Sequence, residues 1–192
     1  MSSSEKNLTK MENKLKIAII GFGRMGITHY SIINSHPLVD LRAVVDTSST
    51  ILGLLKKYTN TKSYNSYEDL FKNESLDAVL ICTPPSMHYE IAMIAYDNNV
   101  NVFLEKPCTL DKSKASKLGA VFDDKGLVNQ VGYVNRFNDA FINVKKLLDK
   151  SLIGKIIRFK SEMYSGTILK SDSSNSWRGS KKSGGGATID MA

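Results

Sequence analysis

Short apolar runs alternate with amphipathic stretches along the first 134 residues. The run at 15–23, LKIAIIGFG, is rich in Ile and ends in glycine, which is typical of a strand buried on both faces. Similar runs predict strands at 40–46, 78–83, 100–104 and 127–134. Apolar residues at helical spacing predict helices over 24–35 and 48–58, a helical turn at 67–72, and helices capped by Ser86 and Asp111. This alternation predicts an α/β fold with a doubly wound parallel sheet.

The pattern changes after residue 134. Residues 139–149 predict an amphipathic helix, 155–163 alternate like a strand, and 170–186 read as a Ser-, Lys- and Gly-rich loop. The last residues, ATIDMA, resemble the start of a helix. We therefore expect a disordered tail over 1–13, a first domain over 14–134, and an incomplete second α/β domain over 135–192.

Composition narrows the class of protein. The chain has 192 residues, 42% hydrophobic and 23% charged, with a formal charge of +7. Only five of the 26 cationic residues are Arg and the Lys are scattered, so we expect no nucleic-acid partner. No run approaches the ~20 apolar residues of a membrane span, and the N-terminus lacks a signal core, so we expect a cytoplasmic protein without a membrane partner. Two cysteines make neither a disulfide framework nor a metal site.

A glycine motif, GFGRMG, follows the first predicted strand and opens the first predicted helix. This placement is typical of a dinucleotide site, where glycines allow a tight turn, close approach of a diphosphate and close helix packing. The first-turn N–H groups of the helix would face the phosphates. A plain glycine turn is the alternative. The candidate cofactor-binding residues are Gly21, Phe22, Gly23, Arg24, Met25 and Gly26.

Asp46 ends the second predicted strand, twenty residues after the motif. A carboxylate there can accept hydrogen bonds from both hydroxyls of the adenosine ribose. It would repel a 2′-phosphate, and the following Thr47, Ser48 and Ser49 supply no Arg to receive one. The sequence therefore favours NAD over NADP as cofactor. A solvated Asp at the end of a strand is the alternative.

Two further motifs follow strands that should end at the same crevice. Thr83, Pro84 and His88 lie in CTPPSMH, and we expect His88 to face the cofactor from the first helical turn. A histidine on a wet helix surface is the alternative. Glu105 and Lys106 lie in EKP, where Lys106 is a candidate for polarising a substrate oxygen. A lysine that snorkels to solvent is the alternative there.

Five segments, GFGRMG, CTPPSMH, EKP, GYVNRF and SGGGATID, occur in an order and near a spacing that resemble the Gfo/Idh/MocA oxidoreductase family. The resemblance covers about residues 15–192. It implies an N-terminal Rossmann domain over 14–134 and then an α/β domain built on an open sheet. It also implies NAD(P)-dependent oxidation or reduction of the CH–OH or C=O group of a sugar, cyclitol or related polyol.

The resemblance also implies roles for single residues. It makes Lys106 and Asp190 catalytic, with Pro107 often cis, and it places Asn135 and Arg136 beside the nicotinamide and substrate. Trp177 and Arg178 match a segment that often reaches the substrate, with simple loop packing as the alternative. The family's acid–base histidine would lie four residues after Asp190, beyond Ala192. We therefore expect this chain, as an N-terminal fragment, to be inactive or weak alone.

Two interpretations of function stay open at this point. The first is a dehydrogenase that acts on a small sugar or polyol and is a homo-oligomer at full length. The second is a non-catalytic dinucleotide-binding sensor, or a decayed and truncated dehydrogenase.

Overall fold

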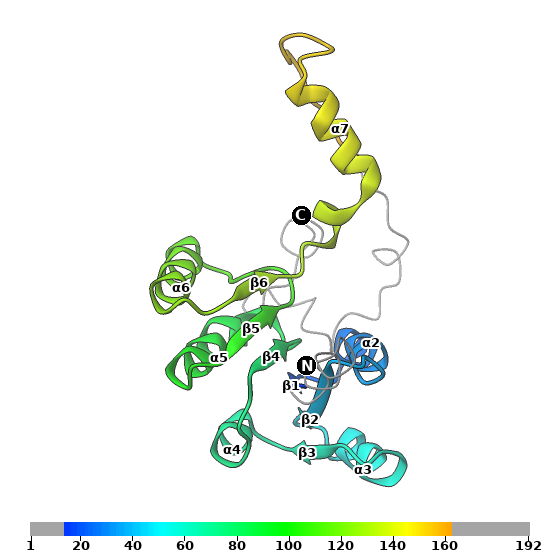
Figure 1. The fold of residues 1–192 in the computed structure, drawn as a ribbon, viewed down its shortest axis with the longest axis vertical. Helices are drawn as coiled ribbons and strands as arrows, with labels where there is room; N and C mark the ends of the chain where they lie inside the picture. The colour runs from blue at the N-terminus through cyan, green and yellow to red at the C-terminus, as the bar shows by residue number, and fades with distance from the viewer. Residues whose placement is uncertain (1–13, 163–192) are drawn as a thin grey trace, which may run out of the picture. The chain divides into compact units, whose positions relative to one another are not determined.

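The computed structural model describes residues 14–162, and these contain a six-stranded sheet in which every pairing is parallel (Figure 1). The strand order is β3-β2-β1-β4-β5-β6. The strands are β1 (Leu15–Ile20), β2 (Val39–Val45), β3 (Lys62–Tyr64), β4 (Ala78–Ile81), β5 (Asn101–Leu104) and β6 (Asn129–Val131). The expected doubly wound parallel sheet is confirmed.

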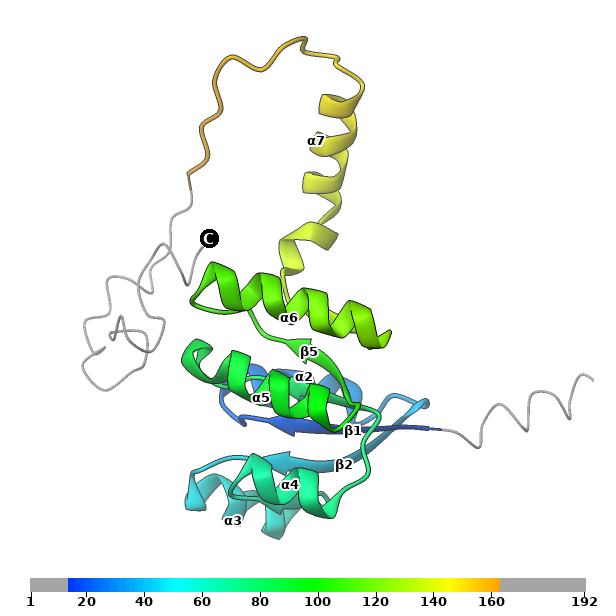
Figure 2. The same cartoon turned by 90° about the vertical axis from the view of Figure 1, so that its left-hand side faces the viewer.

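Helices cover both faces of this sheet. In Figures 1 and 2, α2 and α3 lie on one face, and α4, α5 and α6 lie on the other. Their bounds are α2 (Arg24–Ile33), α3 (Ser49–Tyr58), α4 (Tyr67–Asn73), α5 (Pro85–Asp97) and α6 (Lys112–Lys125). Each parallel strand therefore reaches the next through a helix, as such connections require.

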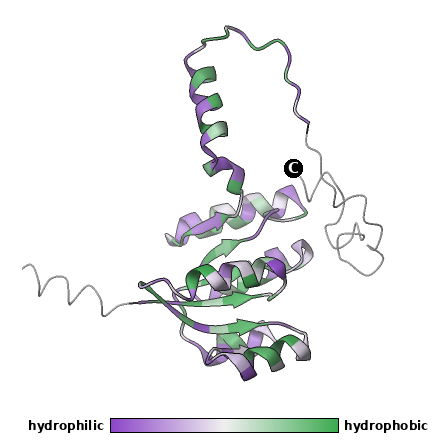
Figure 3. Cartoon of the chain, turned by 90° about the vertical axis from the view of Figure 1, so that its right-hand side faces the viewer, coloured by the Kyte–Doolittle hydropathy of each residue, from purple (hydrophilic) through white to green (hydrophobic). Residues whose placement is uncertain are grey.

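Two apolar clusters hold these layers together because successive strand residues face opposite sides of the sheet. Ala18 and Ile20 of β1 pack into the cluster that includes residues of α4, α5 and α6. Ile17 and Ile19 of β1 pack into the cluster that includes residues of α2 and α3. Figure 3 shows the same arrangement as hydrophobic strands between helices of mixed character. The strands read as continuous apolar runs because both of their faces are buried.

Short polar side chains begin several of the helices. Ser48, Ser66 and Asp111 accept hydrogen bonds from backbone N–H groups in the first turns of α3, α4 and α6. The predicted cap at Asp111 is thus confirmed, whereas the cap expected at Ser86 is wrong. Pro84 is the N-cap of α5 and Pro85 opens that helix. Proline suits this position because the first N–H groups of a helix have no partner within it.

Contacts between residues divide the chain after Val131. The unit that starts at Gly132 contains a 3₁₀ turn, η1 (Val134–Phe137), and α7 (Asp139–Asp149) within its described part. The amphipathic helix expected at 139–149 is confirmed, and Asn138 caps it through Ala140 N–H.

The structure has one strand that was not predicted and lacks one that was predicted. The edge strand β3 was not expected, since its three residues include no apolar run. The strand expected at 155–163 is wrong for its described part, because 155–162 are exposed and have no strand structure. An alternating pattern becomes a strand only when a neighbour supplies hydrogen-bond partners, and no strand among residues 14–162 pairs with this segment. The loop at 170–186 and the helix at the last residues lie outside the described part.

Candidate functional site

The glycine turn lies where the strand order reverses. Strand β1 has β2 on one side and β4 on the other, so the chain leaves β1 in one direction and returns to its opposite side. In such sheets, the crevice outside the carboxyl ends of the strands at this reversal is the usual place for a ligand. Gly21 follows β1 with φ +93°, a backbone conformation that favours glycine. A Cβ at Gly21 would also lie 2.8 Å from the carbonyl carbon of Cys82, so the turn packs directly on the end of β4.

The other two glycines have opposite surroundings. A Cβ at Gly26 would overlap the carbonyl oxygen of Gly21, so the first turn of α2 lies against the glycine turn. A Cβ at Gly23 would meet no atom of residues 14–162 within 4 Å. Gly23 is also the N-cap of α2, and among the described residues no side chain caps this helix start and no acid lies in its first turn. The turn therefore fits a diphosphate, which needs open space at the second glycine and donors at the helix start.

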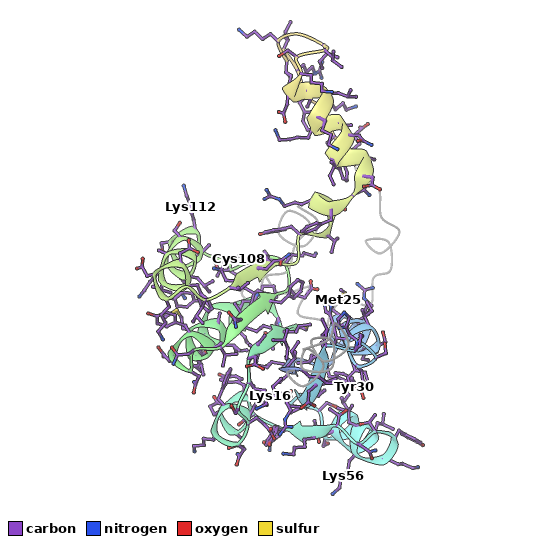
Figure 4. The ribbon with its side chains drawn as sticks, in the orientation of Figure 1. Lys16, Met25, Tyr30, Lys56, Cys108 and Lys112 are labelled. Carbon is purple, nitrogen blue, oxygen red and sulfur yellow. The ribbon has the colours of Figure 1, made fainter. Side chains whose placement is uncertain are left out.

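The other residues of the glycine motif differ in how far they are buried. Phe22 is buried, with its ring against that of Tyr30 at 5.3 Å between centroids, so its side chain belongs to the core. Arg24 is exposed and Met25 is half-buried at the start of α2 (Figure 4).

Asp46 lies beside the glycine turn, at the end of β2. Its Oδ2 accepts a hydrogen bond from the N–H of Phe22 at 2.8 Å, and its Oδ1 accepts one from Ser48 at 2.8 Å. Each carboxylate oxygen has a further lone pair, so these two bonds leave acceptor capacity for a ribose. The carboxylate thus fixes the turn and keeps lone pairs for a further hydrogen-bond donor beside it.

The end of β4 supplies Thr83 and Pro84 to the same crevice. The hydroxyl of Thr83 is buried and has no hydrogen-bond partner among the described residues. A buried hydroxyl without a partner costs free energy, so an additional group that bonds it would be stabilising. Burial raises the pKa of the neighbouring Cys82 to about 12, which keeps that thiol protonated at neutral pH.

The expected orientation of His88 is wrong. The side chain is fully buried rather than turned to the crevice. Its Nδ1 lies 2.8 Å from the carbonyl oxygen of Pro107, and its Nε2 lies 2.9 Å from that of Thr83. The place of His88 in the first turn of α5 could not predict its buried orientation, because both of its partners are backbone atoms outside that helix. With both ring nitrogens occupied, His88 has none to offer a cofactor.

Lys106 and Glu105 follow β5. Glu105 is buried, and its Oε2 accepts a hydrogen bond from the N–H of Lys106 at 3.2 Å. Lys106 is half-buried, and its peptide bond to Pro107 is cis, as the family resemblance implies.

His29 is a site residue that the sequence analysis missed. Its Nε2 lies 2.8 Å from Oε1 of Glu105. Burial raises the pKa of Glu105, but hydrogen bonds and charge from His29 and Lys106 outweigh it, and the pKa lies below its usual value. His29 comes three residues after Gly26, on the helix that opens at the glycine turn, and this spacing was the available signal.

The other expected residues belong to the second unit. Asn135 and Arg136 are exposed in η1, and their roles stay predictions. Trp177, Arg178 and Asp190 lie outside the described residues. Within 14–162, no three His, Cys, Asp or Glu side chains are grouped so that they could hold a metal ion. No helix in that range is long and apolar enough to cross a membrane.

Comparisons with known proteins agree with this geometry. The model of an oxidoreductase family with an NAD-binding Rossmann fold matches residues 15–133. The scyllo-inositol 2-dehydrogenase (NAD(+)) of Bacillus subtilis is 30% identical over 153 residues, which cover 78% of this chain and 44% of that protein. An inositol 2-dehydrogenase of Salmonella typhimurium is 26% identical over 159 residues, which cover 81% of this chain and 47% of that protein.

Solved structures give the same result. The myo-inositol 2-dehydrogenase of Lactobacillus plantarum is similar with a TM-score of 0.66 and 33% identity, over 75% of this chain and 43% of that one. A scyllo-inositol dehydrogenase of Lactobacillus casei, solved with NAD(H) and scyllo-inositol, is similar with a TM-score of 0.67 and 29% identity, over 74% and 43%. The chain thus spans less than half the length of these relatives.

Proposed function

The chain belongs to the Gfo/Idh/MocA oxidoreductase family, an NAD-binding Rossmann family, and from this premise we propose that it is the cofactor-binding part of a polyol dehydrogenase. The whole protein would interconvert a CH–OH and a C=O group of a cyclitol or related sugar. The observation that carries the proposal is the open space at Gly23, at the uncapped start of α2 and beside Asp46.

The residues of the glycine turn would hold the diphosphate. The first N–H groups of α2 have no partner within the helix, and no side chain of the described part of the chain caps them. The partial positive charge of a helix N-terminus favours an anion at this place. Asp46 would bind the adenosine ribose with the lone pairs that its two backbone bonds leave over.

We propose NAD rather than NADP because of Asp46. A 2′-phosphate would bring negative charge next to this carboxylate, and the residues that follow it supply no Arg as a partner. The two NAD-linked inositol dehydrogenases named above, one by its name and one by its bound cofactor, support the same choice.

Lys106 would act on the substrate oxygen. NAD, when bound, supplies the hydride acceptor or donor. The Lys106 ammonium would polarise the hydroxyl or carbonyl oxygen of the substrate, which stabilises the charge that develops there. Its half-buried place after β5 supports this role. Asp190, Asn135 and Arg136 are proposed partners at the substrate, from the family resemblance alone.

A cyclitol is the proposed substrate class because all four relatives named above are inositol dehydrogenases. Their identities of 26–33% support the class and not one compound.

Fluorescence titration of the chain with NADH and NADPH tests the cofactor proposal. We expect saturable binding of NADH and at least ~10-fold weaker binding of NADPH, since discrimination by one charged contact is of this order. A folded chain that binds neither nucleotide would overturn the proposal. A whole protein that binds NADH but reduces no NAD with any cyclitol or sugar would instead favour a dinucleotide sensor.

A further inference from the structure

Residues 105–107, which we call the Lys106 turn, have a histidine at each end. Nε2 of His29 lies 2.8 Å from Oε1 of Glu105, and Nδ1 of His88 lies 2.8 Å from the carbonyl oxygen of Pro107. His29 belongs to α2 and His88 to α5, and these helices cover opposite faces of the sheet (Figures 1 and 2). The residues before and after Lys106 are therefore held from the two opposite layers.

The bond from His29 holds a buried carboxylate. Glu105 is 8% exposed, and a buried carboxylate needs hydrogen-bond donors to stay charged. The ring of His29 is itself held by the edge of the Phe103 ring, at 5.3 Å between centroids. Movement of α2 against β5 would thus break a charge-assisted hydrogen bond, which is among the stronger kinds.

The contacts of His88 join two segments of the crevice. Its ring lies between the carbonyl oxygens of Thr83, after β4, and Pro107, after β5. Both partners accept hydrogen bonds only, and a neutral ring has one N–H, so the ring donates to one of the two carbonyl oxygens at a time. Burial lowers the pKa of His88 below its usual value and outweighs the opposite effect of its backbone hydrogen bonds and of the Glu105 charge, which favours the neutral ring. The ring therefore ties the Lys106 turn to the end of β4.

From these contacts we infer that His29 and His88 are positioning residues that fix Lys106 beside the nicotinamide half of the cofactor. The inference rests on the proposed function. With the adenosine at Asp46 after β2 and the diphosphate at the turn after β1, the nicotinamide half extends across the crevice toward β4 and β5. The two histidines act there through backbone and carboxylate atoms and not on the substrate.

The test compares two ligands on variants of the full 192-residue chain. ADP-ribose carries only the adenosine and diphosphate half, whereas NADH carries both halves. We expect His29→Leu and His88→Leu each to weaken NADH binding about tenfold, the equivalent of one charged or buried hydrogen bond. Binding of ADP-ribose should stay within about twofold of the wild type, since its contacts are at β1 and β2.

Conservative variants and a control complete the design. His29→Gln and His88→Gln keep an N–H donor and should recover most of the NADH affinity. If a Leu variant does not fold, the Gln variant of the same histidine takes its place in the test. His36→Gln is the matched control, because His36 is exposed and lies between α2 and β2. Amide hydrogen exchange over residues 103–108 should speed up in the Leu variants and stay unchanged in this control.

The outcomes separate the inference from the proposed function. Unchanged NADH binding in folded Leu variants overturns the inference, and so does an equal loss of NADH and ADP-ribose binding, which indicates a role in the fold alone. If the wild type binds neither ligand, the proposed function fails. Unchanged exchange over 103–108 then overturns the anchoring by the two histidines as well.

Discussion

The carboxylate of Asp46 and the backbone N–H of Phe22 form a 2.8 Å hydrogen bond between residues 24 positions apart. It joins the end of β2 to the middle of the glycine turn. The second oxygen of the same carboxylate accepts from Ser48 at the start of α3. A single side chain thus sets the shape of the turn and keeps lone pairs that can accept further hydrogen bonds.

Asp46→Ala should therefore weaken NADH binding by about tenfold to a hundredfold. The change leaves the Phe22 N–H without its partner and removes the acceptor proposed for the ribose, at roughly 1–3 kcal/mol for such losses. Fluorescence titration with NADH gives the measurement. Asp40→Ala is the control, because Asp40 lies on β2, which Asp46 follows, and its carboxylate pairs with Arg42 instead. Equal losses of affinity in both variants would contradict this role for Asp46.

Gly26→Ala should destabilise the fold. Its Cβ would overlap the carbonyl oxygen of Gly21, and backbone atoms cannot move aside without shifting α2. We expect a loss of about 1–3 kcal/mol, the range for overpacking. Urea unfolding followed by circular dichroism measures it.

Gly53→Ala is the matched control for Gly26→Ala. Gly53 lies inside α3, and a Cβ there meets no described atom within 4 Å. Alanine is the better helix former, so this variant should gain about 0.5–1 kcal/mol. A Gly26→Ala protein as stable as Gly53→Ala would show that α2 does not lie against the turn as described.

Glu74 should make stability depend on pH. Burial raises the pKa of Glu74, but Lys62, Tyr64 and Arg42 outweigh this through hydrogen bonds and charge, and the pKa lies below its usual value. A lowered pKa in the folded state means that the carboxylate stabilises the fold above its unfolded pKa. This contribution is lost as the pH falls through the folded pKa.

The comparison with Glu74→Gln isolates this effect. Urea midpoints measured from neutral pH downward should fall more steeply for the wild type than for the variant, and the difference between the two should shrink in acid. Parallel curves would contradict the assignment to Glu74.

The sequence was sufficient where one local pattern decides the structure. Apolar runs located β1, β2, β4 and β5, and the glycine spacing located the turn before α2. β3 was missed because an edge strand of Lys62, Ser63 and Tyr64 is recruited by pairing with β2 and not by its own apolar pattern. The segment at 155–162 is the opposite case: its pattern alternates, but no neighbour in the described part of the chain pairs with it.

The candidate site was harder to predict from the sequence, because its contacts join distant segments. His29 and Glu105 are 76 positions apart, so neither residue indicates the other. The motif located His88 on the chain but could not show that its ring turns inward to two backbone carbonyls.

The most direct test of the central claim is NADH titration of Gly23→Val. Gly23 has φ −71°, which any residue adopts, and a Cβ there meets no atom of residues 14–162 within 4 Å, so the variant should fold and lose only about 1 kcal/mol for the poorer N-cap. Its side chain would fill the space assigned to the diphosphate, and we expect saturable NADH binding to disappear. A stable Gly23→Val protein that binds NADH as tightly as the wild type would contradict the claim that the glycine turn holds the cofactor.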